Sequence, residues 1–302
     1  MATAINVNNV SKRQGNVEAL KGVNFSVNRG ELYGLIGPDG AGKTTMFRLL
    51  TTLLVPDEGT VTVDGFDTVK DYEAIRSRVG YMPGRFSLYQ DLTVEENLKF
   101  FASVFSTTIE ENYDLIKDIY AQIEPFKHRR AGKLSGGMKQ KLALSCALVH
   151  KPSVLLLDEP TTGVDPVSRY EFWQMLHKLK EENITIVVST PYMDEAKMCD
   201  RIALINHGQI LKISTPKDIA DDFNDALLEV KGENLYKLML EIRKMRTVKS
   251  CYSFGDSLHV TFSETPDTEG FKKELSELGQ GGLTITPIEA GIEDSYMKLA
   301  DE

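Results

Sequence analysis

The sequence predicts two domains: a large α/β domain over residues 1–217 and a small α+β domain over residues 218–302. The first prediction rests on the short apolar runs LYGLIG, VLLLDE and ITIVVST, which are typical of strands buried in a mostly parallel sheet. The second rests on a change of rhythm after about Thr215, where segments alternate as strand, helix, strand, strand, helix, strand. That order is typical of a ferredoxin-like unit, and a final helix over IEDSYMKLADE follows it.

The composition limits the possible functions. The 302 residues are 41% apolar and 26% charged, as in ordinary soluble globular proteins, and the net charge of −9 argues against a general nucleic-acid binder. The cysteines are odd in number and far apart, which favours a reducing cytosol (Cys146, Cys199 and Cys251). MATAINVNNV lacks the pattern of a signal peptide, and no apolar run reaches the roughly 20 residues of a membrane helix. Any membrane role therefore requires a partner.

The elements of the large domain follow from periodicity and capping. AINVNNV, VNFSV and TVTVDG predict antiparallel strands, and the strand over 32–37 leads into a helix over TTMFRLLTTLL. A helical insert is expected over about 86–150, with a mostly helical stretch over 93–123 that opens on the N-cap Thr93 and a helix over 138–149. A helix capped by Asp165 follows the strand VLLLDE, and RIALINHGQILKIS predicts a hairpin that turns at His207–Gly208.

The motif GPDGAGKTT lies between a predicted strand and a predicted helix, and it matches G-x-x-x-x-G-K-[ST]. Its glycines let successive backbone N–H groups point at phosphate oxygens, aided by the helix N-terminus. Lys43 supplies a positive charge for the β- and γ-phosphates, and the Thr44 hydroxyl can ligate Mg²⁺. The sequence therefore predicts a nucleoside-triphosphate site, formed by Gly37, Pro38, Asp39, Gly40, Ala41, Gly42, Lys43, Thr44 and Thr45.

Two acidic residues end the buried strand VLLLDE. Asp158 is placed to hold Mg²⁺ or its water, and Glu159 is placed to orient or deprotonate the attacking water. A second anion-binding helix end is expected at LSGGMKQKLALS, where Ser135 is a plausible N-cap and two glycines expose backbone N–H groups.

With these motifs in this order, residues 1 to about 217 resemble the ABC ATPases. LSGGM resembles their signature (Leu134, Ser135, Gly136, Gly137 and Met138), and TTGVDP looks like the D-loop around Asp165. The resemblance implies a P-loop NTPase of ABC ATPase type, with a mixed sheet, an antiparallel β subdomain and a helical insert. It also implies ATP and Mg²⁺ as cofactors, and a head-to-tail dimer in which each ATP lies between one phosphate loop and the other signature helix.

The segments LYQDLTVEENL, AGKLSGGMKQK and STPYMDEAKMCDRIALI resemble the ATPase subunits of drug- and antibiotic-efflux transporters. Those subunits tend to carry a small C-terminal domain, and GPDG with Asp39 looks like the first ATPase domain of tandem exporters. This resemblance implies export through a transmembrane permease subunit. It also implies a cytoplasmic protein, peripheral on the inner face of the cell membrane.

Three positions depart from the pattern of the family. Gln14 stands where an aromatic residue stacks on adenine, Gly84 where a glutamine follows YMP, and Pro191 where a histidine senses the γ-phosphate. A glycine has no ligating side chain, and a proline has no backbone donor. Two interpretations follow: either Lys43, Asp158 and Glu159 suffice for slow hydrolysis, or the chain lends its intact signature to a different ATPase subunit in a heterodimer. We favour the heterodimer over a homodimer.

Other features leave alternatives open. The basic run KHRRAGK (127–133) is either a solvated loop or a surface for the membrane subunit, and His207 and His259 lack metal-ligand spacing. ABC proteins that act on ribosomes or DNA usually resemble tandem or coiled-coil versions, whereas this chain has one ATPase domain and no basic tail. An ATP-bound regulatory subunit with little hydrolysis is the more serious alternative.

Overall fold

The chain begins with an antiparallel sheet in the computed structural model, which describes residues 2–85, 87–263, 266–277 and 282–301. Its strands lie in the order β2–β1–β4–β5. They comprise β1 (Thr3–Gln14), β2 (Val17–Asn28), β4 (Glu58–Val63) and β5 (Phe66–Asp67). Ile5 and Val7 are buried on one face of β1, as the alternating sequence pattern predicts.

A six-stranded mixed sheet carries the ends of the motif-bearing strands. Its order is β10–β9–β3–β8–β7–β6, and only the β9–β10 pair is antiparallel among the described pairs. The strands are β3 (Leu32–Ile36), β6 (Val79–Met82), β7 (Val154–Asp158), β8 (Thr185–Thr190), β9 (Arg201–Asn206) and β10 (Gln209–Ser214). Every residue of β3, β7 and β8 is buried, which explains their continuous apolar runs.

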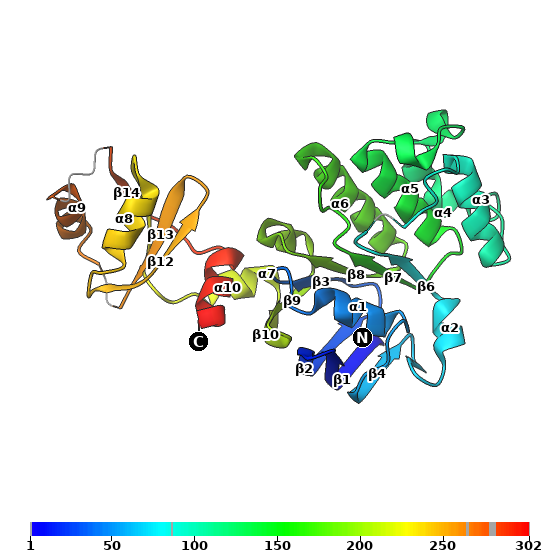
Figure 1. Ribbon diagram of the computed structural model, residues 1–302, viewed down its shortest axis with the longest axis horizontal. Helices are drawn as coiled ribbons and strands as arrows, with labels where there is room; N and C mark the ends of the chain where they lie inside the picture. Colours follow the sequence, from blue (N-terminus) through cyan, green and yellow to red (C-terminus); the bar gives the residue numbers. More distant parts are fainter. Residues whose placement is uncertain (1, 86, 264–265, 278–281, 302) are drawn as a thin grey trace. The chain divides into compact units, whose positions relative to one another are not determined.

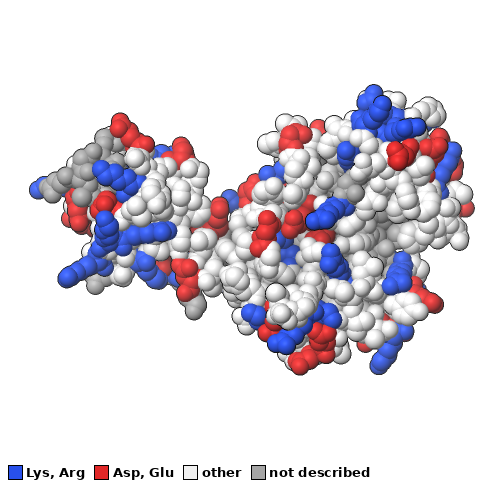
Figure 2. Space-filling model, in the orientation of Figure 1, with Lys and Arg blue, Asp and Glu red and all other residues white. Residues whose placement is uncertain are grey.

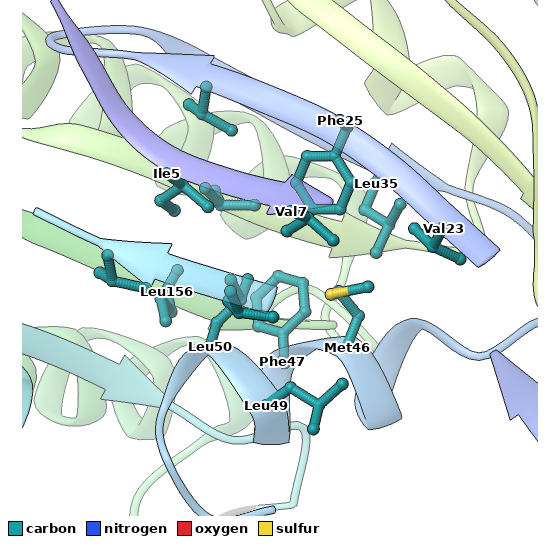
Figure 3. Close-up of a cluster of buried hydrophobic side chains, with 14 of the residues drawn as sticks. Ile5, Val7, Val23, Phe25, Leu35, Met46, Phe47, Leu49, Leu50 and Leu156 are labelled. Atoms are coloured by element: carbon teal, nitrogen blue, oxygen red, sulfur yellow. The ribbon is translucent and has the colours of Figure 1, made fainter. Parts of the chain in front are cut away.

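The helix α1 (Lys43–Leu50) joins the cores of the two sheets. Its side chains Met46, Phe47, Leu49 and Leu50 are fully buried. They belong to one hydrophobic cluster with Ile5, Val7, Val23 and Phe25 of the antiparallel sheet and Leu35 and Leu156 of the mixed sheet (Figure 3). The first turn of α1, which carries the phosphate motif, is therefore anchored in the hydrophobic core.

The segment between β6 and β7 is helical, as expected. Figure 1 shows its helices standing together: α3 (Val94–Val104), α4 (Tyr113–Tyr120) and α5 (Gly136–Leu148), with short 3₁₀ turns at Glu124–Phe126 and Ala131–Lys133. The predicted helical stretch over 93–123 is divided into α3 and α4. The predicted helix over 138–149 begins earlier, at Gly136, because Ser135 caps it. A further short helix, α2 (Tyr72–Arg76), precedes β6.

The remaining elements of the first unit match the sequence expectation closely. α6 (Pro166–Glu181) has Asp165 as its N-cap and Pro166 in its first turn. A 3₁₀ segment (Met193–Met198) follows β8. The β9–β10 hairpin turns at His207 and Gly208, whose φ angles of 45° and 79° are typical of a two-residue type I′ turn.

The chain divides at Pro216 into two compact units, Met1–Pro216 and Lys217–Glu302. The elements from there on are α7 (Pro216–Asp221), β11 (Leu227–Lys231), α8 (Leu235–Ile242), β12 (Val248–Phe254), β13 (Ser257–Phe262), α9 (Thr268–Glu277), β14 (Thr284–Pro287) and α10 (Ile292–Asp301). The four strands pair antiparallel in the order β12–β13–β11–β14. The second unit has its own core, which includes Leu228, Val230, Leu258 and Val260.

Acidic and basic side chains are interspersed on the face of the first unit drawn in Figure 2. Across the described part of the chain, no helix combines the length and the apolar character needed to cross a bilayer.

Candidate functional site

The phosphate motif forms the turn between β3 and α1. A Cβ atom added at Gly37 would lie 2.2 Å from the backbone oxygen of Ile205, and one at Gly42 would lie 2.5 Å from that of Ala19. Gly42 also has a φ of 108°, which L side chains rarely adopt. Close packing therefore requires glycine at both positions. Within the described chain, no side chain caps the N-terminus of α1 at Gly42. The first N–H groups of α1 remain available to an anion.

Lys43 is the buried cation of this loop, with only 3% of its side chain exposed. Its Nζ donates to the backbone oxygens of Gly37 at 2.8 Å and Pro38 at 2.9 Å. The same Nζ lies 3.1 Å from Oε1 of Glu159. The structure thus joins the first and the second predicted motif through one ion pair.

The carboxylates at the end of β7 are held by the neighbouring strand. Ser189 of β8 donates through Oγ to Oδ1 of Asp158 at 2.6 Å, and its Oγ accepts the backbone N–H of Glu159 at 3.0 Å. Glu159 has a φ of 49°, in the left-handed region that non-glycine residues seldom occupy. Such backbone strain costs on the order of 1–3 kcal/mol and persists because the surroundings impose it.

A cavity of about 510 Å³ opens over the phosphate loop. Three parts of the fold line it: the phosphate loop with Glu159, the tip of the β1–β2 hairpin and the β9–β10 turn. From the hairpin come Arg13, Asn16, Val17, Glu18, Ala19 and Lys21, and from the turn come His207 and Gly208. The turn is bonded to the loop, since the N–H of Gly208 donates to the oxygen of Ala41 at 3.0 Å.

The three departures from the family pattern all lie near this site. Nε2 of Gln14 donates to Oγ1 of Thr45 at 3.1 Å, so its amide is held against α1. A Cβ added at Gly84 would lie 3.0 Å from the backbone oxygen of Asp158, which places position 84 against the carboxylate pair. Pro191 directly follows Thr190, whose backbone oxygen accepts the N–H of Gly37 at 3.3 Å.

The signature residues do not line the cavity among the described residues. Ser135 is exposed, and its Oγ accepts the N–H of Met138 at 3.4 Å, a long hydrogen bond. Leu134 is buried, and a Cβ at Gly137 would lie 2.8 Å from Oγ of Ser168. The signature helix therefore presents its N-terminus to the outside of this chain's own site.

Asp165 marks an exposed edge beside the signature. Its Oδ1 accepts the N–H of Ser168 at 3.0 Å, and this backbone hydrogen bond lowers the pKa of Asp165 below its ordinary value. Two apolar side chains of the same helix end, Val167 and Tyr170, are exposed by 69% and 64%.

A network that the sequence motifs do not reveal connects α6 to the segment around Pro191. Nε of Arg169 donates to Oε1 of Glu195 at 3.0 Å, and the guanidinium lies 4.3 Å from the ring centroid of Tyr192. The other oxygen of Glu195 accepts from Oγ1 of Thr190 at 2.5 Å. No sequence motif marks this network, because its members come from α6, β8 and the 3₁₀ segment after β8.

An apolar groove of about 450 Å³ lies next to position 84. Its lining includes Met82, Pro83, Leu88, Phe101, Val104 and Phe105. His150 lines it too and stacks on Phe105, with ring centroids 3.7 Å apart. Burial lowers the pKa of His150 to about 4, so the ring is neutral near pH 7.

Comparison with known sequences places this site in context. The ABC transporter family model matches residues 20–162. The chain is 42% identical over 98% of its length to the probable multidrug ABC transporter ATP-binding protein YbhF of Escherichia coli, but it spans about half (52%) of that relative. It is 35% identical to the Nod factor export ATP-binding protein I of Burkholderia lata, covering 98% of this chain and 96% of that protein.

The chain is also similar in structure to solved ATP-binding cassettes. The chain aligns with a dimer of the ATP-binding cassette MJ0796, bound to ADP and Pi, with a TM-score of 0.63 and 29% identity. That match covers 70% of this chain and 98% of the cassette. An ATP-binding subunit of an ABC transporter aligns with a TM-score of 0.67 and 28% identity, covering 73% of this chain and 93% of that subunit.

Proposed function

Because the chain belongs to the family of ABC transporter ATP-binding proteins, we propose that it binds and hydrolyses ATP to drive export through a partner permease. The observation that carries this proposal is the junction of Lys43 and Glu159 over one cavity. The names of the relatives, a multidrug transporter and a Nod factor exporter, support the direction of transport.

The chemistry follows from the arrangement of the site. The loop N–H groups and Lys43 hold the β- and γ-phosphates, and Glu159 orients the attacking water. The hydroxyl of Thr44 and the carboxylate of Asp158 are the hard oxygen donors that suit Mg²⁺. When bound there, Mg²⁺ would neutralise charge on the phosphate oxygens. Ser189 holds Asp158 through its hydrogen bond and so preserves the orientation of that carboxylate.

A head-to-tail dimer explains the position of the signature. Ser135 and the glycines after it lie outside this chain's own cavity, at an exposed helix N-terminus. A helix N-terminus attracts phosphate, so the signature is suited to the ATP of a second ATPase domain. The dimeric state of the related cassette supports this assembly.

We propose that this chain's own ATP site is degenerate, in that it lacks contacts that the family pattern provides. Gln14 is bonded to Thr45, Gly84 offers no side chain to the carboxylate pair, and Pro191 has no donor for the γ-phosphate. Losing one positioned contact of the transition state typically costs about 2.7–4 kcal/mol. We therefore propose a heterodimer in which this chain turns over its own ATP slowly and completes the competent site of its partner.

The apolar groove beside Gly84 is the proposed contact for the permease. It is lined by residues of β6, α3 and α5, and its rim includes Val104 with 58% of its surface exposed. A cytoplasmic location on the inner face of the cell membrane, and the absence of a nucleic-acid partner, are part of the same proposal. The basic run over 127–133 belongs to the same helical segment. It is either a solvated loop or a second surface for the membrane subunit.

For the second unit we propose the ferredoxin-like fold. Its strands, taken in sequence as one to four, lie in the sheet order two, three, one, four. The two helices α8 and α9 connect the first strand to the second and the third to the fourth, as a split βαβ arrangement requires.

A steady-state ATPase assay of the purified chain tests the proposal. We expect slow turnover in the unmodified chain and a gain of roughly 10²-fold or more when Pro191→His is combined with Gly84→Gln. Most of the gain should come from Pro191→His, because a Cβ at Gly84 requires the backbone near Asp158 to move by a few tenths of an ångström.

Glu159→Gln in the doubly restored variant is the control and should abolish the gain. Turnover in the unmodified chain as fast as in the restored variant would contradict the degenerate site. Absence of turnover in every variant, despite ATP binding, would favour the regulatory alternative.

A further inference from the structure

The tip of the β1–β2 hairpin forms the part of the cavity that lies beyond the phosphate loop. If the phosphates of a nucleoside triphosphate lie on Lys43 and Thr44, its base lies against the remaining lining, in the part of the cavity beyond the phosphate loop. That lining is made by the hairpin and the β9–β10 turn, and its planar side chains are Arg13 and His207. The family's aromatic position, Gln14, is not part of the described lining.

Arg13 is held by a backbone hydrogen bond to Asp57, and its charge also interacts with that carboxylate. Its N–H donates to Oδ2 of Asp57 at 2.7 Å, and Lys12 fixes the other oxygen of Asp57 at 2.6 Å. Within the described residues the guanidinium makes no hydrogen bond or ion pair, and Arg13 is among the residues that line the cavity. A planar guanidinium that makes no hydrogen bond is suited to stack on a base, because guanidinium groups stack on aromatic faces.

Gln14 is not available for this role. Its Nε2 donates to Oγ1 of Thr45, so withdrawing the side chain to stack would break a hydrogen bond to the phosphate loop. Across the hairpin, Glu18 is the direct partner of Arg13 and lines the same cavity. Directly opposite residues in an antiparallel pair project to the same face, so the two side chains approach the base together.

We propose that the guanidinium of Arg13 stacks on the base and that the site therefore accepts ATP and GTP with similar affinity. This inference rests on the proposed function. Stacking reads the face of a base, which all purines share, whereas strong discrimination requires hydrogen bonds to the edge of the base. Glu18 can only accept hydrogen bonds, and both adenine and guanine present N–H donors to it.

The experiment measures the dissociation constants of MgATP, MgGTP and inorganic tripolyphosphate for the full chain. For the unmodified protein we expect the two nucleotides to differ by less than about 10-fold. Arg13→Lys keeps the charge but removes the plane, so it should weaken both nucleotides by about 2- to 5-fold and leave tripolyphosphate unchanged. Arg13→Trp should restore or exceed the original affinity for both nucleotides.

Lys99→Ala is the matched control, since it removes an exposed positive charge of α3 that lies outside the cavity lining and does not support Arg13. It should leave both nucleotide affinities within about 2-fold, and thermal unfolding should confirm that all variants fold. An unchanged nucleotide affinity in Arg13→Lys, an equal loss for tripolyphosphate, or a loss found only in His207→Ala would overturn the role of Arg13. Failure of both nucleotides and tripolyphosphate to bind would instead overturn the proposed function together with this inference.

Discussion

Lys43 and Glu159 illustrate how single residues prepare the site. A buried ammonium is stable only when it is paired and hydrogen-bonded, and Lys43 has two carbonyl oxygens and one carboxylate around it. A γ-phosphate placed on this Nζ would compete with Glu159 for the same charge. We expect that competition to release the Glu159 carboxylate toward water. Phosphate binding would then be coupled to the positioning of the Glu159 carboxylate.

His150 gives the residue-scale prediction of pH dependence. Its folded pKa of about 4 lies below the ordinary value of 6.5, so the unfolded chain takes up a proton that the folded protein excludes. The free energy of unfolding should therefore fall as the pH falls from about 6.5 to about 4, with a contribution from His150 of up to about 3 kcal/mol. Denaturant unfolding of His150→Gln over this range should show a smaller loss.

His150→Phe is the matched variant, because it keeps a ring against Phe105 and has no titrating group. Both variants should share one reduced pH slope, even if their stabilities differ at pH 7. The same slope in the unmodified chain and in both variants would show that His150 titrates alike in the folded and unfolded states.

At the scale of elements, the helices of the insert depend on caps that the sequence encodes. Thr93 and Glu96 form a capping box at the start of α3: Oγ1 of Thr93 accepts the N–H of Glu96 at 3.2 Å, and the N–H of Thr93 donates to Oε2 of Glu96 at 2.8 Å. The backbone hydrogen bond from Thr93 lowers the pKa of Glu96. The cap is therefore fully formed above the ordinary pKa of a glutamate and weakens as the pH falls through the lowered one.

Thr93→Ala should destabilise the first unit by about 1 kcal/mol, because it removes the side chain that satisfies a free N–H of α3. Thermal unfolding should show a decrease of roughly 2–4 °C. Ser103→Ala in the same helix is the control, since among the described residues its Oγ donates to the oxygen of Phe100 alone. It should change the stability by less than about 0.5 kcal/mol. Equal effects of the two substitutions would argue against the capping box.

At the scale of the whole molecule, the two units have separate hydrophobic cores. The cluster around α1 lies within the first unit, and the cluster around Leu228 and Val260 lies within the second. Every residue assigned to the phosphate loop, the carboxylates and the signature belongs to the first unit. Nucleotide binding should therefore not require residues 217–302.

A chain ending at Pro216 should fold and gain stability from MgATP, by about 2.7 kcal/mol when ATP is present at 100 times its dissociation constant. Differential scanning calorimetry of this chain and of the full chain measures the gain. Lys43→Met in both chains is the control and should remove it. A truncated chain that folds but gains nothing from MgATP would show that the second unit contributes to the site.

The local features of the site were predictable because they depend on near neighbours in the chain. The phosphate loop requires small residues within one turn, the caps act over three residues, and the buried strands need only an apolar run. The Asp165 cap and the His207–Gly208 turn follow from such patterns, and the structure confirms them. The division of the predicted stretch over 93–123 into α3 and α4 did not follow, because periodicity alone does not locate the break.

Only the tertiary structure decided which distant residues meet. The order β3–β8–β7 brings Ser189 to Asp158 and Thr190 to Gly37, although each pair is separated by a long stretch of sequence. The same packing bonds Gln14 to Thr45, places Arg13 at the cavity and joins Arg169 to Glu195. Chemical motifs are encoded locally because backbone geometry is local, whereas the partners of a side chain are decided by strand order and by the shared core around α1.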